Sequence, residues 1–131
     1  MNGKNVFYYA ITIGNVCNFV KTIFNQGKQT TYQMRTYYTY ILTNKNKTVL
    51  YVGMTNDITR RILEHKNRDN PKCFTARYNV DRLVWLDVFY TAFEAIAREK
   101  QIKGGSRAKK EALINQYNPE WEDLWEKWQR M

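Results

Sequence analysis

The pattern of apolar and polar positions from residue 36 onward predicts a β-hairpin as the first element. Residues 36–44 are rich in β-branched and aromatic side chains, and residues 48–53 have the same character. The polar run between them, NKNK, is typical of a turn. The two apolar segments are therefore expected to pair as antiparallel strands.

A helix, a loop and a third strand are predicted next. Asn56 or Asp57 can cap a helix that ends near residue 68. Residues 69–81 are expected to form a loop or a short irregular helix, and residues 82–89 have the composition of a strand. The apolar positions of the helix recur at helical spacing and are Ile58, Ile62 and Leu63.

Capping signals predict two further helices. Thr91 and Glu94 form a capping box at the start of a helix that runs to residue 103, where a pair of glycines ends it. Ser106 can cap a second helix, which continues until Asn118 and Pro119 break the pattern. The apolar positions of this second helix are Ala108, Ala112, Leu113 and Ile114.

The segment 120–131 predicts a last helix with one strongly apolar face. Such a face either covers the core of its own domain or contacts a partner protein. The complete order is β, β, α, β, α, α, α, which implies an α+β fold, a small sheet with helices packed on it. The apolar face is formed by Trp121, Leu124, Trp125 and Trp128.

The length and the charge of the chain restrict its class. The 131 residues fit one domain, and the net charge of +9 indicates a polyanion as partner, although a basic protein can also be merely soluble. Cys17 and Cys73 form neither a disulfide framework nor a zinc-binding pattern. We therefore expect a nucleic acid as partner and a reducing cytoplasm as location.

Residues 1–33 differ from the rest of the chain. They contain no acidic residue, and the apolar stretch from Val6 to Phe24 is interrupted by polar side chains. These interruptions argue against a membrane anchor, and no small-x-small cleavage site follows. We predict an N-terminal extension, residues 1–33, outside a core domain of residues 34–131, and no association with a membrane.

The first predicted helix presents a cation and a titratable ring together. Arg61 and His65, the only histidine, lie four residues apart and project from the same side. Tyr51 belongs to the preceding strand, and Gly53 at the junction allows a close approach to the backbone. Arg61 suits bidentate contact with a phosphate. Each side chain also has a structural alternative, as a half-buried aromatic, a solvated arginine or a helix-end histidine.

Glu99 is unusual because the predicted helix 92–103 places it beside apolar residues. A carboxylate on such a face requires a compensating cation, either a buried arginine or a hard divalent ion. Other rotations of the helix would expose Glu99, so these alternatives stay open. The residues that share its face are Ala92, Ala95, Ile96 and Ile102.

Basic residues surround the glycine pair 104–105 and form a candidate phosphate-binding surface. A solvated helix face is the structural alternative. The basic residues are Arg98, Lys100, Lys103, Arg107, Lys109 and Lys110.

Six segments, in order and with suitable spacing, resemble the GIY-YIG nuclease superfamily, and its small stand-alone bacterial members are the most similar. YTYIL and LYVGMT correspond to the two tyrosine motifs, and RRILEH contains Arg61 and His65. Together the segments span residue 34 to about residue 124. They are Tyr38 to Leu42, Leu50 to Thr55, Arg60 to His65, Phe74 to Asn79, Ala95 to Gly104 and Asn118 to Trp121.

This resemblance implies a three-stranded antiparallel sheet flanked by helices and an endonuclease that hydrolyses DNA in repair or processing. By resemblance, Tyr40 and Tyr51 flank the scissile phosphate, and one of them helps to deprotonate the attacking water. Arg61 holds the phosphate and His65 assists proton transfer or phosphate contact. Glu99 binds a single Mg2+ or Mn2+ ion, which polarises the phosphate.

Two further residues follow from the resemblance, and the sequence differs from the superfamily pattern in two ways. Arg60 joins the residues expected to contact DNA, and Asn118 corresponds to a late asparagine in a variable region. Tyr38 replaces the leading glycine of the first motif, as in the small members. Family enzymes that cut defined sites carry a second DNA-binding domain, so branched or single-stranded DNA is the expected substrate here. A DNA-binding module that has lost catalysis is the alternative.

Overall fold

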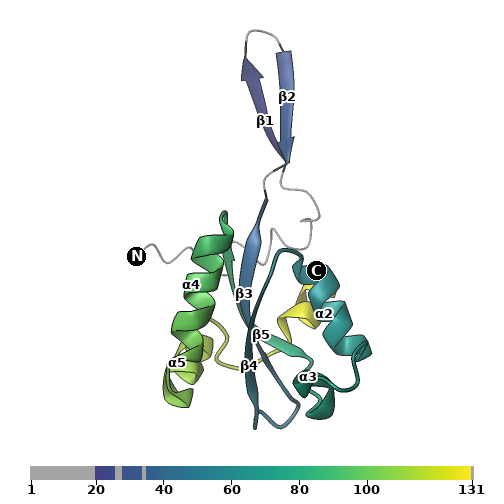
Figure 1. The fold of residues 1–131 in the computed structure, drawn as a ribbon, viewed down its shortest axis with the longest axis vertical. Helices are drawn as coiled ribbons and strands as arrows, with labels where there is room; N and C mark the ends of the chain where they lie inside the picture. The colour runs from purple at the N-terminus through teal and green to yellow at the C-terminus, as the bar shows by residue number, and fades with distance from the viewer. Residues whose placement is uncertain (1–19, 26–27, 34, 131) are drawn as a thin grey trace.

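The computed structural model of the chain describes residues 20–25, 28–33 and 35–130. Its main body is a three-stranded antiparallel sheet in the order β4-β3-β5, flanked by helices (Figure 1). The predicted α+β fold and the order of its elements are confirmed. The strands are β3 (Tyr37–Thr43), β4 (Leu50–Thr55) and β5 (Arg82–Phe89). The helices are α2 (Ile58–Asn67), α3 (Phe74–Arg77), α4 (Ala92–Lys103), α5 (Arg107–Tyr117) and α6 (Leu124–Gln129).

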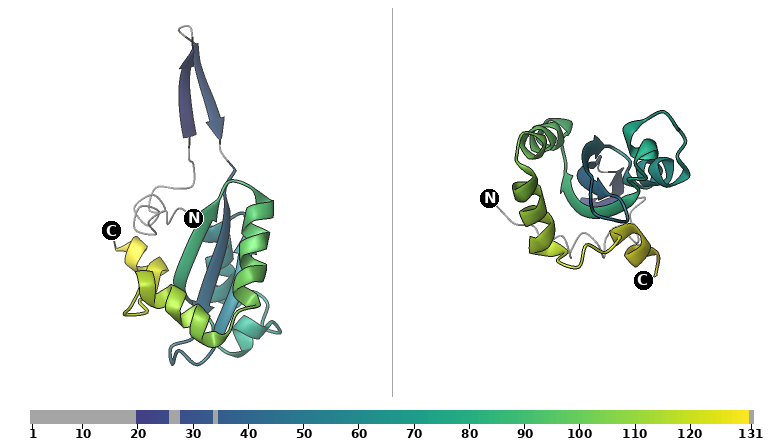
Figure 2. Two further views of the ribbon diagram at one scale, coloured as in Figure 1. Left: turned by 90° about the vertical axis from the view of Figure 1, so that its left-hand side faces the viewer. Right: turned by 90° about the horizontal axis from the view of Figure 1, so that it is seen from below.

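Two apolar cores lie against this sheet. One joins the sheet to α2 and α6 through side chains such as Ile62 and Trp128. The other joins it to α4 and α5 through Ile102 and Ile114. Figure 2 shows the helices on opposite sides of the sheet. The central strand β3 therefore supplies buried side chains to both cores, and its Tyr40 belongs to the core on the α2 side.

Side-chain caps confirm the predicted starts of three helices. Asp57 accepts the backbone N–H of Arg60 at 3.0 Å, which starts α2. Thr91 and Ser106 accept the N–H three residues further on, which starts α4 and α5. Gly104 follows α4, as its position in the sequence predicts.

Four of the positions predicted for the apolar faces of the helices are exposed, so their predicted burial is wrong. A helix that rests on a sheet along one line buries a narrow stripe, and positions beside the stripe stay in solvent. Ile58 and Ile62 form that stripe in α2, and Ile114 does so in α5. The exposed positions are Leu63, Ile96, Ala108 and Ala112.

The last helix begins later than predicted. Trp121 lies before it with a φ of 54° and packs against the core on the α5 side. The helix begins at Leu124 because the carboxylate of Asp123 accepts the N–H of Trp125. Trp125 and Trp128 are buried in the α2-side core. Of the two interpretations of the tryptophan face, coverage of the domain's own core is the one observed.

A hairpin in the N-terminal segment was not predicted. β1 (Val20–Asn25) and β2 (Lys28–Gln33) pair antiparallel and form a two-stranded sheet separate from the β4-β3-β5 sheet. Residues 1–19, including most of the apolar stretch and Cys17, lie outside the described residues. The division into residues 1–33 and 34–131 stays a prediction. Among the helices that the structure describes, none is long and apolar enough to cross a membrane.

Candidate active site

The phenol of Tyr40 lies at the centre of the candidate site. Tyr40 is a β3 residue that pairs with Gly53 of β4, and its side chain is only 1% exposed. A Cβ atom on Gly53 would collide with the ring and the hydroxyl of Tyr40. The missing side chain of Gly53 therefore provides the space in which the phenol of Tyr40 crosses β4. The sequence predicted only that some group could approach the backbone closely at Gly53.

One side of α2 contacts this phenol twice. Arg61 Nε lies 3.2 Å from Tyr40 Oη, and His65 Nε2 lies 3.3 Å from it. Arg61 and His65 are one helical turn apart, so both reach the same atom. Their projection from a common side of the helix, predicted from their spacing, is what brings them to Tyr40.

The donor and acceptor chemistry of these groups determines the direction of the hydrogen bonds. A guanidinium only donates, so Tyr40 Oη accepts from Arg61, and we assign its own O–H to the contact with Nε2 of His65. Nε2 of His65 then has no hydrogen, and the ring carries its proton on Nδ1. That nitrogen lies 2.9 Å from Thr75 Oγ1, which accepts the proton in a hydrogen bond. A chain of hydrogen bonds thus runs from Tyr40 through His65 to Thr75.

Burial shifts the pKa values of the two titratable rings in opposite directions. Desolvation raises the pKa of Tyr40 to about 12, although the hydrogen bond and the charge of Arg61 oppose this. Desolvation, followed by the charge of Arg61, lowers the pKa of His65 to about 4. At neutral pH the protein therefore holds a protonated phenol against a neutral imidazole, which agrees with the assigned hydrogen-bond directions.

The single histidine makes this arrangement directly measurable. We expect its ring signals in an NMR titration to change near pH 4 rather than near the ordinary value of 6.5, because burial and Arg61 disfavour the imidazolium. An unshifted pKa would contradict the buried neutral ring.

The same pKa shift has a consequence for stability. Between about pH 6.5 and 4 the unfolded chain binds a proton at His65 and the folded protein does not. The free energy of unfolding therefore falls as the pH falls through this window, by a few kcal/mol at most, since one pKa unit is worth about 1.4 kcal/mol. Denaturant unfolding of the wild type and of His65→Gln should differ in this pH dependence.

Tyr51 lies beside this chain of hydrogen bonds. It is a half-buried residue of β4, and the centroid of its ring is 5.7 Å from that of His65 and 6.4 Å from that of Tyr40. Its hydroxyl is also among the groups that raise the pKa of Arg61, after Glu64 and Tyr40, and these together outweigh the effect of burial. The structure therefore brings together four of the five predicted catalytic residues.

Glu99, the fifth predicted catalytic residue, belongs to α4, which packs in the core on the other side of the sheet from Tyr40. Its side chain is 20% exposed, and its carboxylate binds Nζ of Lys103 at 2.7 Å. The compensating cation is thus a lysine one turn along the same helix, not the buried arginine considered from the sequence. The charge of Glu99 is close enough to contribute to the raised pKa of Tyr40.

Two residues of the site were missed at the level of sequence. Thr75 belongs to the segment FTARYN, which the resemblance singled out without a role, and its hydroxyl is buried against His65. Glu64 binds the guanidinium groups of both Arg60, at 2.6 Å, and Arg61, at 2.8 Å. The three-residue spacing of Arg61 and Glu64 on one helix could have indicated their ion pair. No local signal in the sequence indicates that Thr75 contacts His65.

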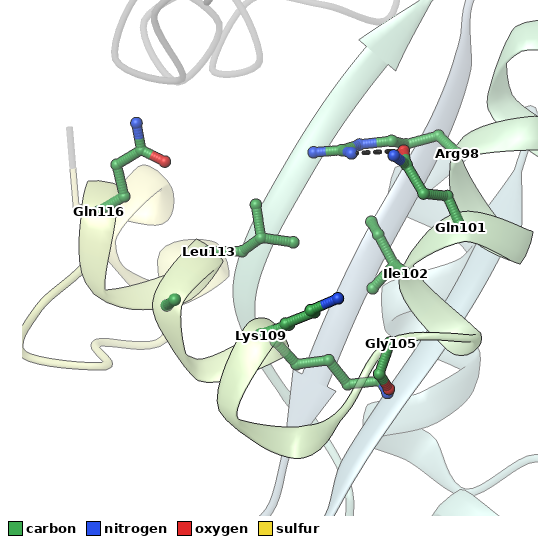
Figure 3. A pocket seen from close by; sticks show the side chains of 9 residues that line it. Arg98, Gln101, Ile102, Gly105, Lys109, Leu113 and Gln116 are labelled. Carbon is green, nitrogen blue, oxygen red and sulfur yellow. Dashed lines mark hydrogen bonds between the residues drawn. The ribbon is translucent and has the colours of Figure 1, made fainter.

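The basic residues near the glycine pair 104–105 have mixed roles. Arg107 donates to the backbone carbonyls of Lys47 and Thr48, and Lys110 donates to that of Gly105 at 2.5 Å, so both stabilise turns. Lys100 and Lys109 are exposed. A groove of about 300 Å3 lies between α4 and α5. Figure 3 shows Arg98, Gln101 and Lys109 among the side chains that line it.

Asn118 lies apart from the tyrosines. Its amide nitrogen donates to the carbonyls of Val84 and Glu122, and its amide oxygen accepts the N–H of Glu122. The hydrogen bond to Val84 attaches the loop after α5 to β5, and the two with Glu122 fix the path of the loop itself. The structure thus places Asn118 in a loop-fixing position.

Comparisons with known proteins find a matching family profile and similar relatives. Residues 36–119 match the protein-family profile described as the GIY-YIG catalytic domain. A UPF0213 protein from Staphylococcus saprophyticus is 40% identical over 83 residues, which cover 63% of this chain and 99% of that relative. A UPF0213 protein from Natronomonas pharaonis is 38% identical over 78 residues, which cover 60% of this chain and 89% of the relative.

A solved structure is also similar. It is the solution NMR structure of a UPF0213 protein from Bacillus halodurans, which is 33% identical in sequence. The similarity covers 66% of this chain and 90% of that one, with a TM-score of 0.43.

Proposed function

Because this chain belongs to the GIY-YIG catalytic-domain family, we propose that it is a metal-dependent endonuclease that hydrolyses phosphodiester bonds of DNA in repair or processing. The observation that carries the proposal is the placement of the Tyr40 hydroxyl between Arg61 and His65. A phenol held between a cation and a neutral imidazole can take part in proton transfer next to a bound phosphate. The family match supports the reaction class, and these contacts support the roles of the three side chains.

Arg61 is the residue that would hold the scissile phosphate. Its Nε contacts Tyr40 and one terminal nitrogen contacts Glu64, while the side chain is partly exposed. A guanidinium has five N–H donors, so it can also bind a phosphate oxygen without losing both partners. Its charge would then stabilise the negative charge that develops on the phosphate in the transition state.

The chain of hydrogen bonds offers a path for the proton of the attacking water. The water would pass a proton to Oη of Tyr40 while Tyr40 passes its own proton to Nε2 of His65. The water oxygen bonds to phosphorus as the bond to the leaving oxygen breaks. The leaving oxygen departs as an alkoxide that takes a proton from solvent water, and the imidazolium afterwards returns its proton to solvent. A pKa of about 12 makes a free phenolate scarce at neutral pH, and this concerted transfer avoids it. The phosphate bound at Arg61 would offset the charge that, after burial, lowers the pKa of His65, which favours the imidazolium in the complex. Thr75 would keep its hydrogen bond to Nδ1–H of the imidazolium.

Glu99 is the residue that would hold Mg2+ or Mn2+. Among the described residues, no three His, Cys, Asp or Glu side chains lie close enough to form a metal site by themselves. A single carboxylate still fits Mg2+, which keeps several waters and takes other ligands from substrate phosphates. When bound, such an ion supplies positive charge that polarises the phosphate. Lys103 would have to leave the Glu99 carboxylate for this.

A DNA-binding module without catalysis is the second candidate. It is favoured by the ion pair between Glu99 and Lys103, which compensates the carboxylate without a metal ion. The net charge of +9 and the exposed side chains of Arg60, Lys100 and Lys109 support DNA binding in both cases.

Cleavage assays with different metal ions distinguish the two candidates. We expect the purified protein to nick supercoiled plasmid and to cut a branched oligonucleotide with Mg2+ or Mn2+, and to do neither with a chelator, because one carboxylate and the substrate must share the ion. Gel analysis of the products measures cutting, and fluorescence anisotropy of the labelled oligonucleotide measures binding. Binding without cutting under every metal condition would favour the DNA-binding module.

A further inference from the structure

Two exposed aromatic rings lie side by side on the α3 side of the sheet. Phe74 is the first residue of α3 and is 49% exposed, and Tyr78, which follows α3, is 46% exposed. Their ring centroids are 4.8 Å apart. Large apolar rings in contact with water are uncommon as a pair and indicate a surface that binds something.

This aromatic pair continues from the candidate active site. The ring of Phe74 is stacked on that of Tyr51, with centroids 6.5 Å apart and planes 26° apart, and Tyr51 in turn contacts the ring of His65. Thr75, the next residue of α3, is buried and hydrogen-bonded to His65. Thr75 and Phe74 therefore attach α3 to the site, while the rings of Phe74 and Tyr78 remain about half exposed to solvent.

The charge around the aromatic pair favours an anionic occupant. Lys72 and Arg77 are exposed beside it, and the sequence has no acidic residue between Asp69 and Asp81. In the part of the chain that the structure describes, neither Lys72 nor Arg77 forms an ion pair. Aromatic rings together with unpaired cations match a nucleotide, which offers a π-face and a phosphate, better than they match an apolar protein surface.

We propose that Phe74 and Tyr78 bind an unpaired nucleobase of the DNA whose phosphate lies at Arg61 and Tyr40, an inference that rests on the proposed function. A base inside a duplex is covered on both faces by its neighbours, so a protein ring stacks on an unpaired base without the cost of separating neighbouring base pairs. The substrate class that follows is DNA with unpaired nucleotides at the point of cleavage. A single strand and a branch point share this chemistry.

The test measures stacking directly and without cleavage. A short homothymidine oligonucleotide that carries one 2-aminopurine is titrated in the presence of a chelator, and a fully paired duplex of the same length is titrated in parallel. We expect the fluorescence of 2-aminopurine to be quenched on binding to the single strand. Phe74→Leu and Tyr78→Leu should each abolish most of this quenching and weaken single-strand binding by about tenfold, because each removes a stacking ring but keeps an apolar side chain.

Phe93 supplies the matched control. It is an aromatic residue of α4 that is 82% exposed, so Phe93→Leu removes a ring that is even more accessible but lies elsewhere. We expect this variant to bind both oligonucleotides as the wild type does. Thermal unfolding of each variant shows whether it is folded, and Tyr78→Leu, which lies outside α3, provides the test if Phe74→Leu is not.

The outcomes separate this inference from the proposed function. Quenching that depends on Phe74 and Tyr78 in a protein that cuts nothing would support the stacking site and contradict the endonuclease. Single-strand binding that is unchanged in both variants would overturn the stacking site, even if the protein cuts DNA. A branched oligonucleotide with 2-aminopurine at its junction distinguishes a branch point from a single strand. A dimer that Phe74→Leu dissociates, seen by sedimentation, would also overturn the proposal, since a second protein copy would then cover the rings.

Discussion

Glu99→Gln is expected to lower the rate of DNA cleavage by about a thousandfold or more and to leave DNA affinity within about threefold of the wild type. Loss of the charge that holds a divalent ion removes several kcal/mol of transition-state stabilisation, and about 4 kcal/mol corresponds to a thousandfold in rate. The amide has the size of the carboxylate, so α4 should stay folded. Single-turnover cleavage with Mg2+ or Mn2+ and anisotropy titrations measure the two quantities.

The next helix provides a closely matched control. Glu111 of α5 binds Arg107 at 2.8 Å, one turn away, just as Glu99 of α4 binds Lys103 at 2.7 Å. Glu111→Gln therefore removes an equivalent ion pair, and we expect it to cut DNA at the wild-type rate. If both variants lost activity equally, or if Glu99→Gln only lowered the melting temperature, Glu99 would be a structural residue and the metal site would be elsewhere.

Much of the fold could be predicted because its signals are local. The start of α4 follows from the capping box of Thr91 and Glu94, which are three residues apart in the sequence and bonded in the structure. β5 was predicted with its observed bounds, since its unbroken apolar run from Leu83 to Leu86 suits a strand covered on both faces. The start of α6 was missed because the same face pattern fits a helix from Trp121 or from Leu124, and the cap at Asp123 decides between them.

The residues of the site could be predicted from the sequence, but their pKa shifts and ion pairs could not. The spacing of Arg61 and His65 indicates a common side of α2, but nothing local indicates that Tyr40 from another element lies between them. The pKa shifts of Tyr40 and His65 arise from burial, which is a property of the packed domain. The partner of Glu99 illustrates the same limit, because i,i+4 spacing permits Lys103 and only the observed rotamer selects it.

Tyr40→Phe is expected to lower cleavage by about 10^2- to 10^4-fold, the range of general acid–base catalysis, with DNA affinity nearly unchanged. The substitution removes the hydroxyl that contacts Arg61 and His65 and leaves the ring in its space over Gly53. It also leaves Nε2 of His65 without its hydrogen-bond donor, which costs about 1–3 kcal/mol of stability. Single-turnover rates and denaturant unfolding measure the two effects separately.

The same strand and a double variant distinguish catalysis from structural support. Tyr38 lies two residues before Tyr40, is similarly buried and bonds Thr36 at 2.9 Å, so Tyr38→Phe removes a comparable hydroxyl away from Arg61 and His65. We expect this variant to keep nearly full activity. If Tyr40 and His65 act in one proton transfer, His65→Gln added to Tyr40→Phe should slow cleavage little further, because residues that act as a unit are not additive. If the double variant instead lost activity by the product of the two single losses, the two side chains would act independently and no proton would pass between them.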